Sequence, residues 1–245
     1  NDSCGILVDG FDSPPYVMMP HNPPYYKDLL ENIGFKKHCD VYSYIIECNH
    51  IPSITVEKAI QLEDSLREEN ILFRNINIKN YDDEIKKIRI VYNDSIGEIP
   101  GEQSMTQEEI KNLFDSFKLI LKVDYVQVAE HNGQIIAVMA TIPNINETIK
   151  NIKKGRLLPF GIFKLLFNLK KIKTARFAVI GIMKQYKGKG ISVVFYKKIK
   201  DLCNKYNFEK FEASWIAEHN YDIRNGIEKM GGKITKTYRI YEKQL

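Results

Sequence analysis

Long apolar runs are missing from this sequence of 245 residues. The longest ones, residues 157–163 and 175–183, fall well short of the roughly 20 apolar residues that span a bilayer. The first residues also lack an initiator Met, and they lack the basic start and apolar segment of a secretory signal. We therefore expect a soluble globular protein whose sequence begins partway through a longer chain.

Cysteine is scarce, and its four residues are scattered along the chain at Cys4, Cys39, Cys48 and Cys203. No Cys-x-x-Cys pair occurs, and no His stands nearby at a spacing that suits a metal. The sequence therefore indicates neither a disulfide framework nor a zinc site, and no metal is expected. A reducing cytoplasm is the expected compartment.

Acidic residues are absent from residues 150–176, which contain nine Lys and Arg residues. Within this segment, residues 156–173 place Leu and Phe between lysines. Such a stretch suits an anionic membrane surface, or short helices that cover a sheet and leave their lysines in solvent. The density of Leu and Phe favours the second interpretation, without stable membrane insertion. The same core-like pattern, with no recognition motif, argues against a nucleic-acid partner.

Turn and capping signals divide the first third of the chain. Asn22 before two prolines predicts the N-cap of a helix that Gly34 ends. Residues 4–8 and 41–46 are typical of strands. Residues 54–74 carry closely spaced opposite charges, which indicates an exposed helix that ends near Asn70.

Strands and helices alternate in the remainder of the chain. Thr106 with Glu109 predicts a capping box for a helix over residues 107–121. The turn at residues 131–134 contains Asn-Gly and predicts an antiparallel hairpin. The other expected strands are residues 88–92, 125–130, 135–142, 175–183, 210–216 and 233–241. The other expected helices are residues 146–153, 160–170, 190–206 and 220–230.

The most informative segment is residues 180–192, where an apolar strand leads through a basic, Gly-rich turn directly into a helix. Glycines let a backbone approach an anion closely, and the free N–H groups of a helix N-terminus attract phosphate. Lys187 and Lys189 add positive potential there. The spacing fits neither the Gly-x-Gly-x-x-Gly motif nor a Walker A loop. The turn therefore predicts a phosphate site of another type.

This turn resembles the pyrophosphate loop of the GNAT superfamily of acyl-CoA-dependent N-acyltransferases, whose pattern is Arg/Gln-x-x-Gly-x-Gly/Ala. Residues 185–190 match its letters, whereas residues 187–192 fit its usual distance from the strand, and we prefer the second register. The resemblance implies that acetyl-CoA or a related acyl-CoA binds there, with its pantetheine arm beside the strand. The implied cofactor contacts are Ile182, Lys187, Gly188, Lys189, Gly190, Ile191, Ser192 and Asn220.

The order of elements resembles the same superfamily over residues 86–245, including an Asn that opens the last helix. The fold class implied is α/β, with a mixed, mostly antiparallel sheet flanked by helices. Residues 1–50 resemble the end of another domain of this kind, without its pyrophosphate loop. We therefore expect a tandem protein in which residues 51–85 form a linker helix region and residues 1–50 are the remnant of a first domain.

One position departs from the superfamily pattern. Many members carry a Tyr seven residues after the helix-opening Asn, where it protonates the departing thiolate, but Ile227 stands here. For the base, Glu218 follows an apolar strand end, which suits deprotonation of an ammonium group. Glu212 is less attractive because it lies inside a strand, and His219 is a further candidate for proton transfer.

The function implied is acyl-CoA-dependent transfer, most simply of an acetyl group, to an amine by direct attack. The acceptor is expected to be a small molecule or a peptide. Catalysis then depends on positioning and on stabilisation of the carbonyl oxygen. The alternative is a non-catalytic acyl-CoA-binding module of a tandem protein, because the acid at position 227 is missing.

Overall fold

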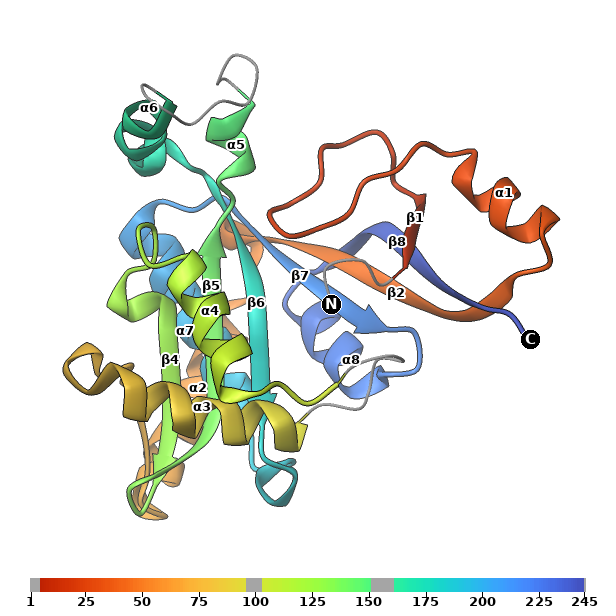
Figure 1. Ribbon diagram of the computed structural model, residues 1–245. Helices are drawn as coiled ribbons and strands as arrows, with labels where there is room; N and C mark the ends of the chain where they lie inside the picture. The colour runs from red at the N-terminus through yellow and green to blue at the C-terminus, as the bar shows by residue number, and fades with distance from the viewer. Residues whose placement is uncertain (1–4, 96–102, 151–160, 245) are drawn as a thin grey trace.

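The computed structural model describes residues 5–95, 103–150 and 161–244 of the chain. Its centre is one eight-stranded sheet with the strand order β1-β8-β2-β7-β6-β5-β4-β3. All neighbouring strands are antiparallel except β6 and β7, which are parallel. Figure 1 shows helices on both sides of the sheet, with α3 and α4 in front of it and α2 and α7 behind it. The predicted fold class, a mixed and mostly antiparallel α/β sheet with flanking helices, is confirmed.

The elements have the following bounds. The strands are β1 (Ile6–Asp9), β2 (Lys36–Glu47), β3 (Ile71–Asn75), β4 (Val126–His131), β5 (Gln134–Pro143), β6 (Thr174–Ile182), β7 (Lys210–Ala217) and β8 (Lys233–Glu242). The α-helices are α1 (Tyr26–Asn32), α2 (Ser53–Glu68), α3 (Tyr81–Ser95), α4 (Gln107–Ser116), α5 (Asn146–Ile149), α6 (Gly161–Asn168), α7 (Ile191–Tyr206) and α8 (Tyr221–Lys229).

Two local predictions for the first hundred residues are wrong. The predicted strand over residues 88–92 is part of α3, because Ile85, Ile88 and Val91 recur at a helical spacing and are all buried. Asn22 does not cap α1, which begins at Tyr26. The Asn22 side chain instead accepts from Leu7 N at 2.7 Å and donates to Leu7 O at 3.1 Å.

The first fifty residues contribute to the central sheet. β2 pairs with β7 on one side and with β8 on the other, and β1 pairs with the outer edge of β8. That residues 1–50 are the remnant of a first domain, residues 51–85 a linker and residues 86–245 a second domain remains a prediction about how the chain arose. In space, however, the remnant's strand lies inside the sheet of the following domain.

A disulfide bond corrects the expectation from cysteine spacing. Cys48 and Cys203 are bonded, with 155 residues of sequence separation, and Cys39 is free and buried. The spacing gave no signal because the partners lie at the end of β2 and on α7, which only the fold brings together. In the part of the chain that the structure describes, no helix has the length and apolar character needed to cross a membrane.

The basic segment 156–173 is only partly described, since residues 151–160 lie outside the described ranges. Of its described end, Ile172 is buried in the main core, as expected for a segment that covers the sheet. Phe167 on α6, by contrast, is 80% exposed. The prediction that this segment folds against the domain therefore holds for Ile172 and fails for Phe167.

Candidate functional site

The two parallel strands part in the middle of the sheet. Their pairing starts at Thr174 with Lys210 and ends at Phe177 with Ala213. Beyond that point β6 continues beside β5 alone, and β7 continues beside β2 (Figure 1). This opening, which we call the β6–β7 divergence, leaves the backbone of the last β6 residues without a strand on one edge. An extended ligand placed there can hydrogen-bond to that edge as a strand would.

The Gly-rich turn follows directly at the end of β6. Gly188 has φ +83° and Gly190 has φ +85°, a left-handed conformation that side chains rarely adopt. α7 then begins at Ile191 without a side-chain cap, and Val193 N donates to Gly190 O at 3.0 Å. The amides of Ile191 and Ser192 therefore precede the first such bond into the helix, at its positive end. The geometry suits a phosphate oxygen.

α2 supports this turn from behind. A Cβ on Gly190 would lie 3.1 Å from the Leu62 methyl groups, so any larger residue there would push the Leu62 side chain of α2 away from the turn. Lys189 forms an ion pair with Glu69 just beyond the end of α2. Gly188, by contrast, has no atom within 4 Å of such a Cβ. The predicted linker helix thus positions the turn, and Gly188 marks its open side.

Of the predicted cofactor residues, all but Asn220 lie at the end of β6, in the turn that follows it, or at the start of α7. Lys187, Gly188 and Lys189 are exposed in the turn, whereas Ile191 is buried. Ile182 is the last residue of β6 and pairs with Ala137 of β5. Their role in binding a cofactor stays a prediction, which the turn geometry supports.

Asn220 lies at the end of the other diverging strand, where it caps α8. Its side chain accepts from Ile223 N at 3.3 Å, as predicted for the residue that opens this helix. A pocket of about 310 Å³ is lined by residues 219–222. Ile227, which stands where the superfamily pattern has its acid, is buried in the main core. The missing acid is therefore replaced by a packing residue.

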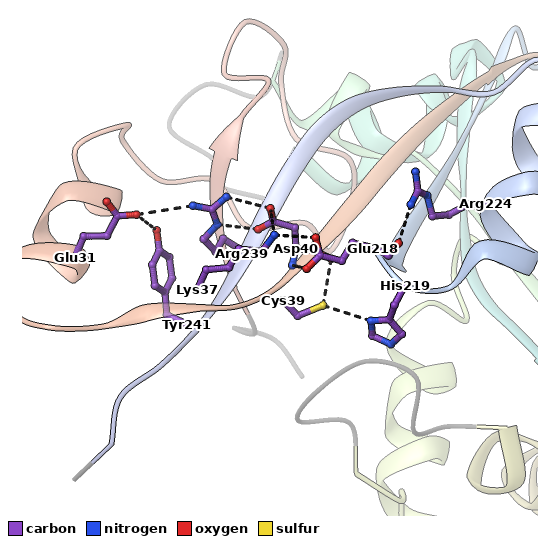
Figure 2. A network of polar contacts seen from close by, with 9 residues as sticks. All are labelled: Glu31, Lys37, Cys39, Asp40, Glu218, His219, Arg224, Arg239 and Tyr241. Atoms are coloured by element: carbon purple, nitrogen blue, oxygen red, sulfur yellow. Dashed lines mark hydrogen bonds and ion pairs between the residues drawn. The ribbon is translucent and has the colours of Figure 1, made fainter.

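Glu218, two residues before Asn220 in the sequence, lies in a network of charges (Figure 2). Its carboxylate accepts from Lys37 Nζ at 2.7 Å and from Asp40 N at 3.1 Å, and its backbone carbonyl accepts from Arg224 at 2.7 Å. The side chain is 31% exposed. Both carboxylate oxygens thus accept hydrogen bonds from residues of β2. A catalytic role for Glu218 stays a prediction.

His219, the other candidate for proton transfer, contacts a cysteine. Its Nδ1 lies 3.9 Å from Sγ of Cys39, and Figure 2 shows the pair beside the Glu218 network. Burial raises the pKa of the Cys39 thiol, which keeps the thiol protonated. The contact therefore does not provide a reactive thiolate.

One pair of residues was not recognised together from the sequence. Arg176 of β6 and Glu212 of β7 are register partners, and both are buried. The sequence did carry a signal, because each is a charged residue inside an otherwise apolar strand. Strand pairing could not be read from the sequence, so their proximity was missed. Among the described residues, no group of three or more His, Cys, Asp or Glu is placed to hold a metal.

Similarity to solved structures identifies the fold. A GCN5-related N-acetyltransferase from Sphaerobacter thermophilus matches with a TM-score of 0.59, at 12% identity over 91% of this chain and 58% of that one. The chain has the GCN5-related N-acetyltransferase fold. A GCN5-related glucosamine N-acetyltransferase region of a fungal multi-domain β-N-acetylglucosaminidase also matches, with a TM-score of 0.53, at 14% identity over 88% of this chain and 22% of that one.

Two curated relatives are more similar to this chain in sequence than these solved structures are. The bacterial ceramide synthase of Caulobacter vibrioides is 32% identical over the whole chain, and Protein YghO of Escherichia coli is 31% identical. The chain spans 64% and 63% of the length of these two relatives. No protein-family profile matches the chain.

Proposed function

We propose that this chain is an acyl-CoA-dependent N-acyltransferase. The observation that carries the proposal is the combination of the β6–β7 divergence with the Gly-rich turn at the end of the same strand. The turn and the first amides of α7 suit the pyrophosphate of coenzyme A. The free edge of β6 suits its extended pantetheine arm. The thioester then lies near the point where the two strands meet.

Direct transfer needs little covalent chemistry from the protein. The neutral amine attacks the thioester carbonyl carbon, a C–N bond forms, and the C–S bond breaks. One proton leaves the ammonium before the attack, and a second passes from nitrogen to the departing thiolate. Holding both reactants in line supplies most of the acceleration. The buried Ile227 cannot act as the acid, so another group or water protonates the thiolate.

The relatives suggest which amine is acylated. A ceramide is the amide of a long-chain amino alcohol, so the name of the Caulobacter relative describes the same bond formation. We propose that the acceptor here is also a long-chain amino alcohol. The donor is an acyl-CoA, and acetyl-CoA is its shortest common form. The relatives are longer than this chain, and the fold alone does not identify an acceptor. The identity of the acceptor is therefore part of the proposal.

The binding of the cofactor can be tested with two matched glycines. Gly188 has φ +83° and Gly133 of the hairpin has φ +79°, and a Cβ added at either position would have no atom within 4 Å. Gly188→Glu and Gly133→Glu therefore carry a similar backbone cost, but only the first adds a negative charge to the turn. Calorimetric titration with acetyl-CoA and palmitoyl-CoA should show binding by the wild type and by Gly133→Glu. Binding to Gly188→Glu should weaken at least roughly tenfold.

Equal affinity of the two variants would place the cofactor elsewhere and end this proposal. Catalysis is then measured as thiol release from either acyl-CoA in the presence of a long-chain 2-amino-1,3-diol. Amine-dependent release identifies an enzyme. Cofactor binding without amine-dependent release would favour the non-catalytic module, for which the buried Ile227 is the supporting observation.

A further inference from the structure

A buried pair of opposite charges lies where β6 and β7 begin to diverge. Arg176 and Glu212 are the register pair immediately before the last pair, Phe177 with Ala213. The exposed fraction is 0% for Glu212 and 8% for Arg176. Charged groups are expensive inside a sheet unless they are fully paired. In the proposed function the thioester lies beside this pair. Any hydrogen-bonding atom of the pair that has no partner is therefore a candidate contact for the substrate.

The pair does not satisfy itself completely. Ser43 Oγ donates to Glu212 Oε1 at 2.7 Å, which occupies one carboxylate oxygen. The other oxygen, Oε2, lies 3.2 Å from Arg176 Nε, but the two atoms are not aligned for a hydrogen bond. Arg176 directs its Nη1 to Val17 O instead, at 2.7 Å. Among the described residues, Oε2 of Glu212 thus keeps its ion pair with Arg176 but accepts no well-aligned hydrogen bond.

Two further polar atoms of the same region lack hydrogen bonds within the described residues. They are Trp215 Nε1 on β7 and the Tyr238 hydroxyl on β8, and both are buried. The two rings contact each other, with centroids 5.8 Å apart, in an otherwise apolar cluster. Burying a polar group without a partner is unfavourable, so such groups are uncommon without a functional reason. We call Arg176, Glu212, Trp215 and Tyr238 the buried polar cluster.

The N-terminal residues 10–19 cover this cluster. Lys236 donates to Gly10 O and to Ser13 O, and Arg176 donates to Val17 O. Asn144 accepts from Val17 N at 3.1 Å, so the segment is also tied to the residues after β5. The segment forms neither helix nor strand and is held largely through its own backbone groups. The segment therefore packs over the sheet without being one of its strands.

Burial and the polar groups on neighbouring elements act in opposite directions on the pKa of Glu212. Burial raises the pKa of Glu212, while Arg176, Ser214, Ser43 and Lys236 act in the opposite direction. Burial also raises the pKa of Tyr16 in the covering segment to about 12, so its hydroxyl stays neutral. A carboxylate whose pKa is raised by burial is a stronger base than one in water.

We infer that Glu212 is the proton acceptor for the acceptor amine, and that the buried polar cluster binds the amino-alcohol end of that substrate beneath the segment of residues 10–19. Oε2 of Glu212 takes one proton from the ammonium, which leaves a neutral amine to attack the thioester. The second nitrogen proton goes to the thiolate as the C–S bond breaks. Trp215 Nε1 and the Tyr238 hydroxyl are donors for a substrate hydroxyl. This inference rests on the proposed N-acyltransferase function.

The main test compares Glu212→Gln with Glu218→Gln, since Glu218 is the rival base. The acceptor probes are a long-chain alkylamine and the O-alkylhydroxylamine of the same length, with palmitoyl-CoA as donor. The alkylamine is charged at neutral pH and needs a base, whereas the alkoxyamine is already neutral. Glu212→Gln should lose roughly 10²-fold or more in kcat/KM with the alkylamine and roughly tenfold or less with the alkoxyamine. Glu218→Gln should change both rates alike, and palmitoyl-CoA affinity should stay unchanged.

A second variant tests whether loss of activity in Glu212→Gln results from misfolding. Arg176→Met with Glu212→Met removes both charges together, which is tolerated far better than leaving one unpaired. Circular dichroism should show a folded protein that has lost its alkylamine activity. Retained alkylamine activity in this double variant, or equal losses with both probes in Glu212→Gln, would overturn the inference. A wild type that binds palmitoyl-CoA but acylates neither probe would instead count against the proposed function itself.

Discussion

At the scale of single residues, buried and partly buried charges in this protein are held by specific partners. Asp40 on β2 accepts from Arg239 Nε at 2.8 Å and Nη2 at 3.0 Å, and it pairs with Lys37 at 3.0 Å. Burial alone would raise the pKa of Asp40, but the bonds from Arg239 and Lys37 outweigh it and hold the pKa below its usual range. The sequence shows these charges but not their pairing, because the partners are up to 199 residues apart.

This depressed pKa predicts an acid-sensitive contribution to stability. A carboxyl group whose folded pKa lies below its unfolded pKa stabilises the protein above about pH 4, and the contribution disappears as the pH falls through the folded pKa. Asp40→Asn should therefore lower the free energy of unfolding at pH 7 by about 1 kcal/mol, allowing for solvent screening. The variant should also lose less stability between pH 5 and pH 2. Urea titrations across this range measure both effects.

The matched control is Asp82→Asn, which removes a solvent-exposed ion pair with Lys111. Its unfolding curve should follow that of the wild type more closely at every pH. A wild-type protein and an Asp40→Asn variant with parallel pH curves would contradict the assigned role of Asp40.

At the scale of elements, local signals worked where a single segment determines the outcome. The capping box at Thr106 and Glu109 is present, and the hairpin turn at residues 131–134 joins β4 to β5. α3 was missed because its β-branched residues suggested a strand, although their spacing fits a helix. α2 was predicted correctly as a helix, but its packing against the Gly-rich turn depends on a contact that no local pattern shows.

The capping box makes a quantitative prediction for α4. Thr106 Oγ1 accepts from Glu109 N at 3.2 Å, and Glu109 Oε2 accepts from Thr106 N at 2.8 Å. Thr106→Ala should lower the free energy of unfolding by about 1 kcal/mol, because one amide of the first turn loses its acceptor. Ser116→Ala at the other end of α4 is the control, since Ser116 only donates to the preceding turn at Asn112 O. Denaturant midpoints that fall equally in both variants would show that the cap contributes nothing.

At the scale of the whole molecule, the sheet joins segments that the sequence suggested were separate. β2 was predicted as a strand of a remnant domain, yet it pairs with β7 through residues 41–47 and with β8 through residues 36–45. β8 has only β1 and β2 as neighbours in the described sheet. The sequence could not show this, because strand order depends on pairings between residues far apart in the chain, such as Ile6 with Arg239 and Lys36 with Glu242. The predicted boundary at residue 50 therefore separates β1 and β2 from the strands with which they pair.

This arrangement predicts that a chain of residues 51–245 does not fold alone. Without β2, the edges of β7 and β8 that pair with it are exposed, and no strand connects β8 to the rest of the sheet. We expect this fragment to lack a cooperative thermal transition and to aggregate. Co-expression with a separate 1–50 fragment should restore a soluble complex, since β2 can pair in trans. Cys48→Ser in that fragment removes the bond to Cys203, so the association then depends on strand pairing alone. A fragment 51–245 that unfolds cooperatively by itself would instead make residues 1–50 a dispensable addition to an independent domain.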